Sequence, residues 1–124
     1  MRIMAPISLG ELVDKITILE IKLENVTDPT KRHNIRVELD ELNTIYEPIK
    51  NRQLENFHIE LKKVNEDIWK LEDTIREAIK AESTDLLFTV TAMSIPKTND
   101  ERAAIKKQIN EQFGSDIIEE KLYA

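Results

Sequence analysis

The sequence predicts an all-α fold, an antiparallel helical bundle in which three long helices are followed by two short C-terminal helices. Apolar residues recur at alternating steps of three and four in three long segments, which is the heptad spacing of coiled-coil-like packing. The chain has 2 Gly and 4 Pro in 124 residues, too few for the many turns of a β-rich protein. This length suits one domain, so residues 1–124 are expected to form a single helical unit.

The first helix is expected at about residues 9–26. Ser8 and Glu11 have the spacing of a capping box, which satisfies free backbone N–H groups where a helix begins. A second apolar stripe shares a face with Asp14, and a helix that is apolar on two faces is covered on two sides. This helix is therefore the expected centre of the domain. Its main stripe consists of Leu9, Leu12, Ile16, Leu19, Leu23 and Val26, and its second stripe of Ile18 and Ile21.

The second and third helices are expected at about residues 29–46 and 52–81. Asp28–Pro29 is a strong start signal, because Asp caps a helix and Pro fits its first turn. Glu47–Pro48 ends the second helix, since a residue before Pro avoids the α conformation. The third helix would be roughly 45 Å long and the first two roughly 27 Å each. The part of the third helix that extends beyond the other two therefore needs another partner to cover its apolar stripe. The C-terminal segments or a second subunit can provide it, and we expect a homodimer or another homo-oligomer.

Two short helices are expected after the third. Ser83–Asp85 is a polar break that can cap a fourth helix, although the Thr and Val content of residues 86–95 leaves a strand possible there. Pro96 is expected to end this element. Thr98–Glu101 is a second capping box that starts the fifth helix, and Gly114 ends it.

The composition excludes several classes of function. The chain has no Cys, so it forms no disulfide framework, thiolate nucleophile or cysteine metal site. Its net charge of −6 argues against general binding to nucleic acid or to an anionic membrane. No apolar run reaches the ~18 residues of a membrane span, and residues 1–6 lack the apolar core of a signal peptide. We expect a cytoplasmic protein without a cofactor.

Several blocks spread over most of the chain carry a family pattern. They are Ser8–Lys22, Asn34–Arg36, Val64–Trp69, Glu72–Arg76, Lys97–Lys106, Gly114–Ser115 and Glu119–Lys121. On these blocks the chain resembles a small family of bacterial and phage proteins of unknown function. The resemblance implies an all-helical fold and a gene neighbourhood of glycosyltransferases and other surface-polysaccharide genes. The chain departs from the pattern before Lys97, where Ile95–Pro96 replaces the usual aromatic residue.

Asp14 is the most informative candidate for a binding site. It lies on the second apolar stripe of the first helix, and a covered carboxylate needs a positive or hydrogen-bonding partner. Arg102 and Lys121 are the candidate partners. This pairing serves either as an internal salt bridge or as part of a site for a small anion or a protein partner. The candidate site residues are Asp14, Lys15, Lys97, Asn99, Arg102 and Lys121.

An alternative function is that of a magnesium-dependent enzyme. Glu82 and Asp85 resemble the second acidic motif of all-helical nucleotide pyrophosphohydrolases, in which carboxylates hold Mg²⁺ against phosphates. Such enzymes also need a Glu-x-x-Glu pair on a preceding helix. The pair available here is Glu38 with Glu41, and the whole third helix separates it from the later motif. Glu82 and Asp85 are more simply interpreted as a helix cap.

The histidines and the single Trp have simpler interpretations. His33 and His58 lack the spacing of a zinc site, and we expect both on the solvated surface. Trp69 follows a residue of the main apolar stripe, so we expect it at the rim of the core, against the second helix or a partner chain. Stacking on a ligand is the less favoured alternative. The sequence therefore favours a non-catalytic helical interaction or accessory module, and the family resemblance implies a link to surface-polysaccharide synthesis.

Overall fold

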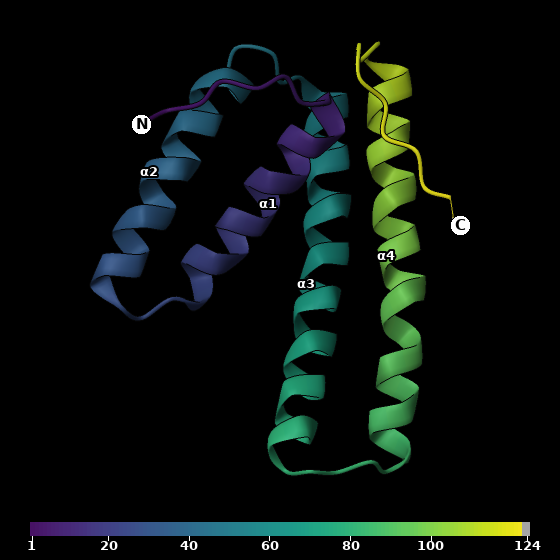
Figure 1. The fold of residues 1–124 in the computed structure, drawn as a ribbon. Helices are drawn as coiled ribbons and strands as arrows, with labels where there is room; N and C mark the ends of the chain where they lie inside the picture. The colour runs from purple at the N-terminus through teal and green to yellow at the C-terminus, as the bar shows by residue number, and fades with distance from the viewer. Residues whose placement is uncertain (123–124) are drawn as a thin grey trace.

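The computed structural model describes residues 1–122, which contain four α-helices and no strand. In chain order these are α1 (Leu9–Asn25), α2 (Pro29–Tyr46), α3 (Arg52–Lys80) and α4 (Leu86–Gln112). Figure 1 shows two antiparallel hairpins, α1 with α2 and the longer α3 with α4, whose connecting turn projects well beyond the first hairpin. The all-α class is confirmed, and the first three helices match their expected bounds to within one residue.

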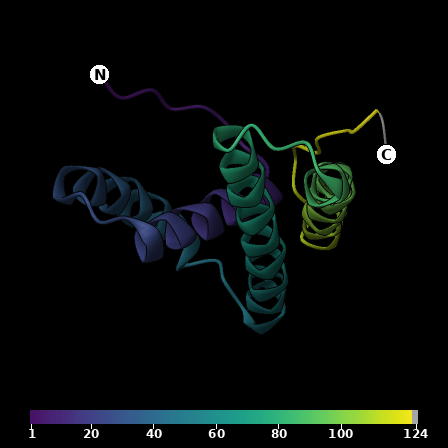
Figure 2. The ribbon, with the colours of Figure 1, turned by 90° about the horizontal axis from the view of Figure 1, so that it is seen from below.

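Helix α1 is the centre of the arrangement, as its two apolar stripes predicted. It contacts α2, α3 and α4, whereas α2 packs along α1 and meets α3 at its C-terminal end, where Tyr46 contacts His58. Figure 2 shows α1 and α2 on one side of α3 and α4 on the other. The start of α1 is capped as expected, because the Ser8 hydroxyl accepts a hydrogen bond of 3.0 Å from the Glu11 backbone N–H. Asp28 caps α2 and Asn51 caps α3 in the same way.

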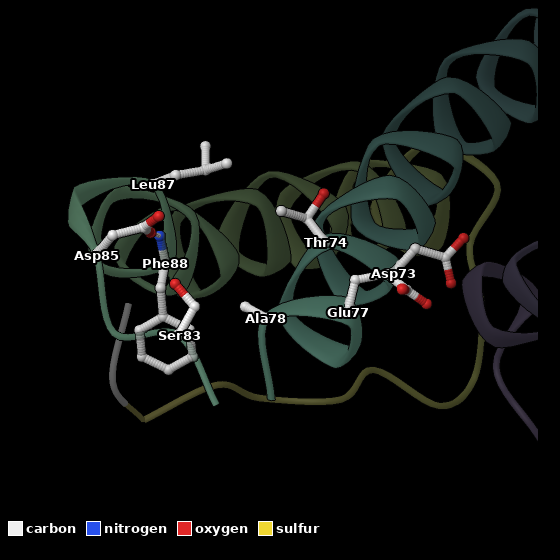
Figure 3. A pocket seen from close by; sticks show the side chains of 8 residues that line it. All are labelled: Asp73, Thr74, Glu77, Ala78, Ser83, Asp85, Leu87 and Phe88. Carbon is white, nitrogen blue, oxygen red and sulfur yellow. Dashed lines mark hydrogen bonds between the residues drawn. The ribbon is translucent and has the colours of Figure 1, made fainter. Parts of the chain in front are cut away.

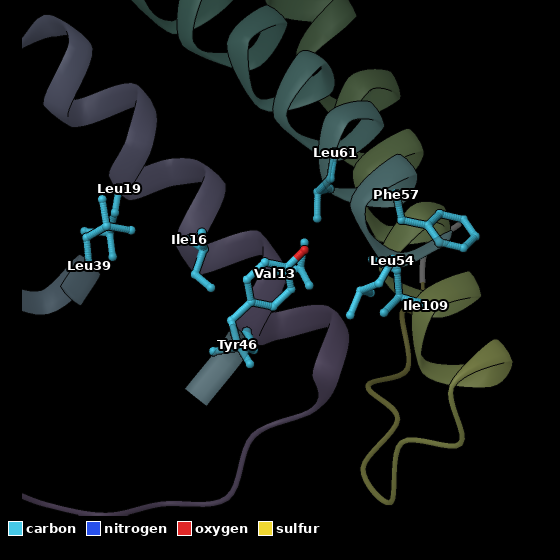
Figure 4. Packing of buried hydrophobic residues seen from close by; sticks show 10 residues of the cluster. Val13, Ile16, Leu19, Leu39, Tyr46, Leu54, Phe57, Leu61 and Ile109 are labelled. Carbon is cyan, nitrogen blue, oxygen red and sulfur yellow. The ribbon is translucent and has the colours of Figure 1, made fainter. Parts of the chain in front are cut away.

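The hydrophobic core lies where α1 crosses the other helices, near the start of α3 and the end of α4. Val13, Ile16, Leu61 and Ile109 are at most 1% exposed, and they come from three different helices. Figure 4 shows them converging with Tyr46 from the end of α2. Burying each such side chain contributes about 1.5–3 kcal/mol, so this crossing holds the two hairpins together.

The expected two short C-terminal helices are a single helix, α4, which corrects the prediction from the sequence. Residues 86–95 are helical, and Pro96 lies inside the helix rather than at its end. The Thr98 hydroxyl donates to the Ser94 carbonyl at 2.9 Å instead of capping a new helix. Pro inside a helix costs about 3 kcal/mol. Packing against α3, which runs beside α4 (Figure 1), outweighs this cost, and it buries Thr91 before Pro96 and Ile109 after it.

The turn between α3 and α4 closes with a left-handed residue that is not Gly. Glu82 has a φ of 52°, and its N–H donates to the Ile79 carbonyl at 3.1 Å. The Ser83 N–H donates to the Ala78 carbonyl at 2.9 Å, which completes a Schellman motif. At the end of α4, Gly114 has a φ of 63° and the Ser115 N–H donates to the Asn110 carbonyl at 2.8 Å, which confirms the expected stop. Residues 115–122 add no further helical turn.

The far half of the long hairpin, residues 66–96, is a two-helix structure with little interior. We call these residues the distal hairpin. No residue from Glu66 to Val90 is buried, and Thr91 is the first buried residue of α4. Two helices alone cannot enclose a core, so their apolar seam stays partly open to solvent. None of the described helices carries a stretch long and apolar enough to cross a membrane.

Candidate functional site

A buried polar cluster lies where α1, α3 and α4 meet, and Asp14 is at its centre. Asp14 and Thr17 are fully buried on α1, and Asn65 of α3 is 5% exposed. The Asn65 amide donates to Asp14 Oδ1 at 2.9 Å and to Thr17 Oγ1 at 2.8 Å. Arg102 of α4 donates from Nε to Asp14 Oδ1 at 2.9 Å and from Nη2 to Asp14 Oδ2. The carboxylate thus binds one guanidinium bidentately, the strongest form of this ion pair.

Positive charge compensates the carboxylates in this cluster. The hydrogen bond from Arg102 to Asp14 raises the pKa of the guanidinium above its usual value, outweighing the opposite effect of burial. Lys106 donates to Glu11 Oε2 at 2.6 Å, and its Nζ lies 3.9 Å from Asp14 Oδ2. The Arg102 side chain remains 29% exposed, whereas Asp14 is 0% exposed. The ion pair is therefore buried at its acidic end and open to solvent at its basic end.

Helix α1 approaches α4 closely at Gly10, and only Gly fits there. A Cβ atom at this position would lie 2.6 Å from the Lys106 carbonyl oxygen, closer than van der Waals contact allows. The Gly10 N–H donates to Asn110 Oδ1 at 2.7 Å, which satisfies one of the free N–H groups at the start of α1. This contact fixes the distance between α1 and α4 and so holds Asp14 within reach of Arg102.

The C-terminal tail closes over the start of α1. Glu119 accepts hydrogen bonds from the Ser8 hydroxyl and, at 3.2 Å, from the Asn110 side-chain amide. The Leu9 N–H donates to Ser115 Oγ at 3.2 Å. Burial alone would raise the pKa of Glu119, but the hydrogen bond from Ser8 and the nearby Lys106 charge hold it below its usual value. The tail thus places a carboxylate at the positive end of α1.

The structure unites only part of the predicted binding residues. Asp14 pairs with Arg102, one of its two expected partners. Lys121, the other, pairs with Asp100 instead, so that expectation is wrong. Lys15 and Lys97 are exposed, Asn99 is half-buried, and none of these three has a hydrogen bond from its side chain to the cluster.

Sequence reasoning missed Asn65 and Asn110 as members of this cluster. Asn65 lies four residues after Leu61 and three before Ile68, so it interrupts an apolar helix face. Asn110 directly follows the buried Ile109. An Asn within or beside an apolar stripe indicates a buried hydrogen-bond partner, because an unpaired buried amide is costly. That signal was available in the sequence for Asn65.

The four carboxylates of the hydrolase alternative lie at separate places. Glu38 and Glu41 are on α2, which packs along α1 and does not pack along α3 or α4 in the described chain. Asp85 caps α4, accepting a hydrogen bond of 3.0 Å from the Phe88 N–H. It lines an open hollow of 430 Å³ at the hairpin turn, together with Asp73 and Glu77 of α3 (Figure 3). Within residues 1–122, no three acidic or His side chains are placed to share a metal ion.

His58 joins the three helices α1, α2 and α3 instead of lying free on the surface, which corrects the expectation for it. Its Nδ1 lies 3.1 Å from the Tyr46 hydroxyl and its Nε2 lies 2.6 Å from Glu20 Oε1. Burial and the carboxylates around it raise the pKa of Tyr46 to about 12. His33 is exposed on α2, as expected.

A pocket of 170 Å³ adjoins the polar cluster between α1, α3 and α4. We call it the Trp69 pocket. Its apolar wall consists of Ile18, Ile21, Ile68 and the indole of Trp69. Its polar residues are Asn65, Glu72, Asp73, Arg76 and Arg102. The half-buried Trp69 therefore lies beside α1 rather than against α2, which corrects its expected position, and it forms one side of the pocket.

Comparison with known protein families gives one match. Residues 3–124 match the model of a family of unknown function, DUF6165. The chain belongs to this family. The match spans all four helices, so the polar cluster, the tail contact at Glu119 and the Trp69 pocket all lie within the family domain.

The other comparisons add no relative of known activity. No curated protein and no solved structure matches the chain. Any assignment of function therefore depends on the geometry of the family domain itself.

Proposed function

We propose that this protein is a non-catalytic helical interaction module that works as a symmetric homodimer through its distal hairpin. The observation that carries the proposal is the outer face of α4. Leu86, Leu87, Val90 and Met93 are 77%, 64%, 53% and 73% exposed. Residues 86–96 contain no charged side chain. A contiguous exposed apolar face of this kind indicates an interaction surface.

The inner seam of the distal hairpin supports the same conclusion. Ile68, Leu71 and Ile75 lie on the amphipathic stripe of α3, yet all three are only half-buried. A second pair of helices packed against this seam would give the four-helix arrangement that encloses such stripes. The solvent-exposed area of the chain also supports a dimer, because it is larger than that of a compact monomer. The chain exposes 8689 Å², whereas a compact protein of 14.4 kDa exposes about 6,800 Å².

We favour a second copy of this chain as the partner that covers the apolar surface of the distal hairpin. The excess of about 1,850 Å² over the compact value exceeds the ~800 Å² that each partner buries in a standard interface. A two-fold axis pairs a surface with itself, so an uncharged face meets an uncharged face without burying unpaired charge. The charges that flank it on α3 have both signs, as in Lys70, Asp73, Arg76, Glu77 and Lys80.

We further propose the process in which the module acts, and the alternative function is magnesium-dependent nucleotide hydrolysis. The resemblance to a family encoded near glycosyltransferases makes surface-polysaccharide synthesis the process in which we propose that the module acts. The separation of Glu38 and Glu41 from Glu82 and Asp85 supports a non-catalytic role over a magnesium-dependent hydrolase. Magnesium-dependent nucleotide hydrolysis that Asp85→Asn abolishes would overturn this part of the proposal.

Light scattering coupled to size-exclusion chromatography tests the dimer. We expect a particle of twice 14.4 kDa at about 50 μM protein. Val90→Glu and Met93→Glu each place a charge on the outer face of α4. Both variants should be monomers with unchanged helix content by circular dichroism. Ile59→Glu is the matched control, because Ile59 is 68% exposed on α3 outside the distal hairpin, and it should remain dimeric. A wild-type monomer, or a control that dissociates as readily, would overturn the proposed interface.

A further inference from the structure

The Trp69 pocket presents an unused hydrogen-bond acceptor at its inner end. Both N–H groups of the Asn65 amide are used, by Asp14 and by Thr17. The carboxylate of Asp14 can only accept, so the amide orientation is fixed and its oxygen points elsewhere. That oxygen accepts from no described residue, and no fully buried side-chain oxygen of residues 1–122 lacks a partner. The Asn65 oxygen is therefore open to the pocket that Asn65 lines.

Two guanidinium groups line the same pocket. Arg102 uses two of its five N–H groups on Asp14, which leaves three for another acceptor. Asp14 holds this guanidinium in place from behind, in the way that a buried carboxylate orients a binding group. Arg76 also lines the pocket and forms no ion pair in the described chain. Guanidinium groups bind carboxylates well because their N–H pairs match the two oxygens.

The Trp69 pocket is also lined by two acidic side chains and by an apolar surface. Glu72 and Asp73 line the pocket beside Arg76, and neither forms an ion pair among residues 1–122. Ile18, Ile68 and the Trp69 indole provide an apolar surface. At ~30 Å³ per water, 170 Å³ holds about six water molecules, which is room for a small organic ligand that extends partly into the solvent.

We propose that the Trp69 pocket binds a free hydrophobic α-amino acid. Arg76 and the outer edge of Arg102 take its carboxylate, and Glu72 or Asp73, with the Asn65 oxygen, takes its ammonium group. The aliphatic or aromatic side chain lies against Ile18, Ile68 and the indole. A zwitterion has a partner for each of its charges, whereas a phosphate dianion would face two carboxylates. This inference goes beyond the proposed dimer, because it assigns a small-molecule ligand to the pocket between α1, α3 and α4, which shares Ile68 with the proposed interface.

The single Trp of the chain makes the test direct, because its fluorescence reports on this pocket. Titration with L-leucine and L-phenylalanine should give a saturable change in emission with a Kd below ~1 mM. N-acetyl-L-leucine lacks the ammonium charge and L-leucinamide lacks the carboxylate, so each should bind at least tenfold more weakly than L-leucine. Inorganic phosphate should produce no saturable change.

Variants separate this site from non-specific binding. Arg76→Gln should weaken L-leucine binding at least tenfold, and it should leave the fold intact because Arg76 is exposed. Arg36→Gln is the matched control, an exposed Arg on α2 far from the pocket, and it should bind like the wild type. The monomeric Val90→Glu variant should also bind L-leucine, which keeps this test independent of the dimer. No saturable binding, equal binding of N-acetyl-L-leucine, or an unaffected Arg76→Gln variant would overturn the proposal.

Discussion

Replacing Asp14 by Asn should destabilise the fold by about 2–4 kcal/mol. Asn keeps Oδ1 for Arg102 Nε and for the Asn65 amide, but it puts an N–H group where Asp14 Oδ2 accepted from Arg102. The loss is one charge-assisted hydrogen bond, worth about 1.5–3 kcal/mol, plus a donor that faces a donor. Arg102 is 29% exposed and can turn towards water, which keeps the cost below the ~3–5 kcal/mol of a broken, fully buried pair.

Arg102→Met is the variant to compare with Asp14→Asn, because it removes the guanidinium and leaves the buried Asp14 carboxylate without its main partner. Asp14 is 0% exposed and would keep only the Asn65 amide and Lys106 at 3.9 Å, so this variant should cost about 3–5 kcal/mol. Urea unfolding followed by circular dichroism measures both variants. Glu77→Gln is the control, since its pair with Lys80 is 76% exposed on both sides and should contribute under ~0.5 kcal/mol. An Asp14→Asn variant as stable as the control, or less stable than Arg102→Met, would refute this reasoning.

Two further predictions concern the turn and the tail. Glu82→Gly should stabilise the protein by about 0.5–1 kcal/mol, because Glu82 has a φ of 52° and Gly adopts it without strain; a thermal melt with a lowered midpoint would contradict this. The lowered pKa of Glu119 means that its contribution to stability is fully present above pH 4.5 and is lost as pH falls through the folded-state pKa. The difference in melting temperature between wild type and Glu119→Gln should therefore be present at pH 7 and shrink as the pH is lowered below 4.5. A difference that stays constant until the protein unfolds in acid would exclude the tail contact as its source.

The sequence by itself determined the helical class and most helix ends. Ser8, Asp28 and Asp85 all cap helices in the structure, and Gly114 ends α4, as expected. Capping and heptad spacing act between residues three or four apart, so they can be read without knowing the partners of a helix. The same local reasoning placed Asp14 on a covered face of α1, whereas Arg102 was a candidate partner because it lies in a block that carries the family resemblance.

Only the tertiary structure decided which faces and which charges meet. The local rule that Pro ends a helix failed at Pro96, because packing of α4 against α3 exceeds the local cost of about 3 kcal/mol. The choice of Arg102 over Lys121 follows from the close approach of α1 and α4 at Gly10, which no local pattern encodes. The Trp69 pocket depends on the positions of three helices at once. Local interactions set where each helix begins and ends, but distances between residues far apart in sequence depend on how the helices pack.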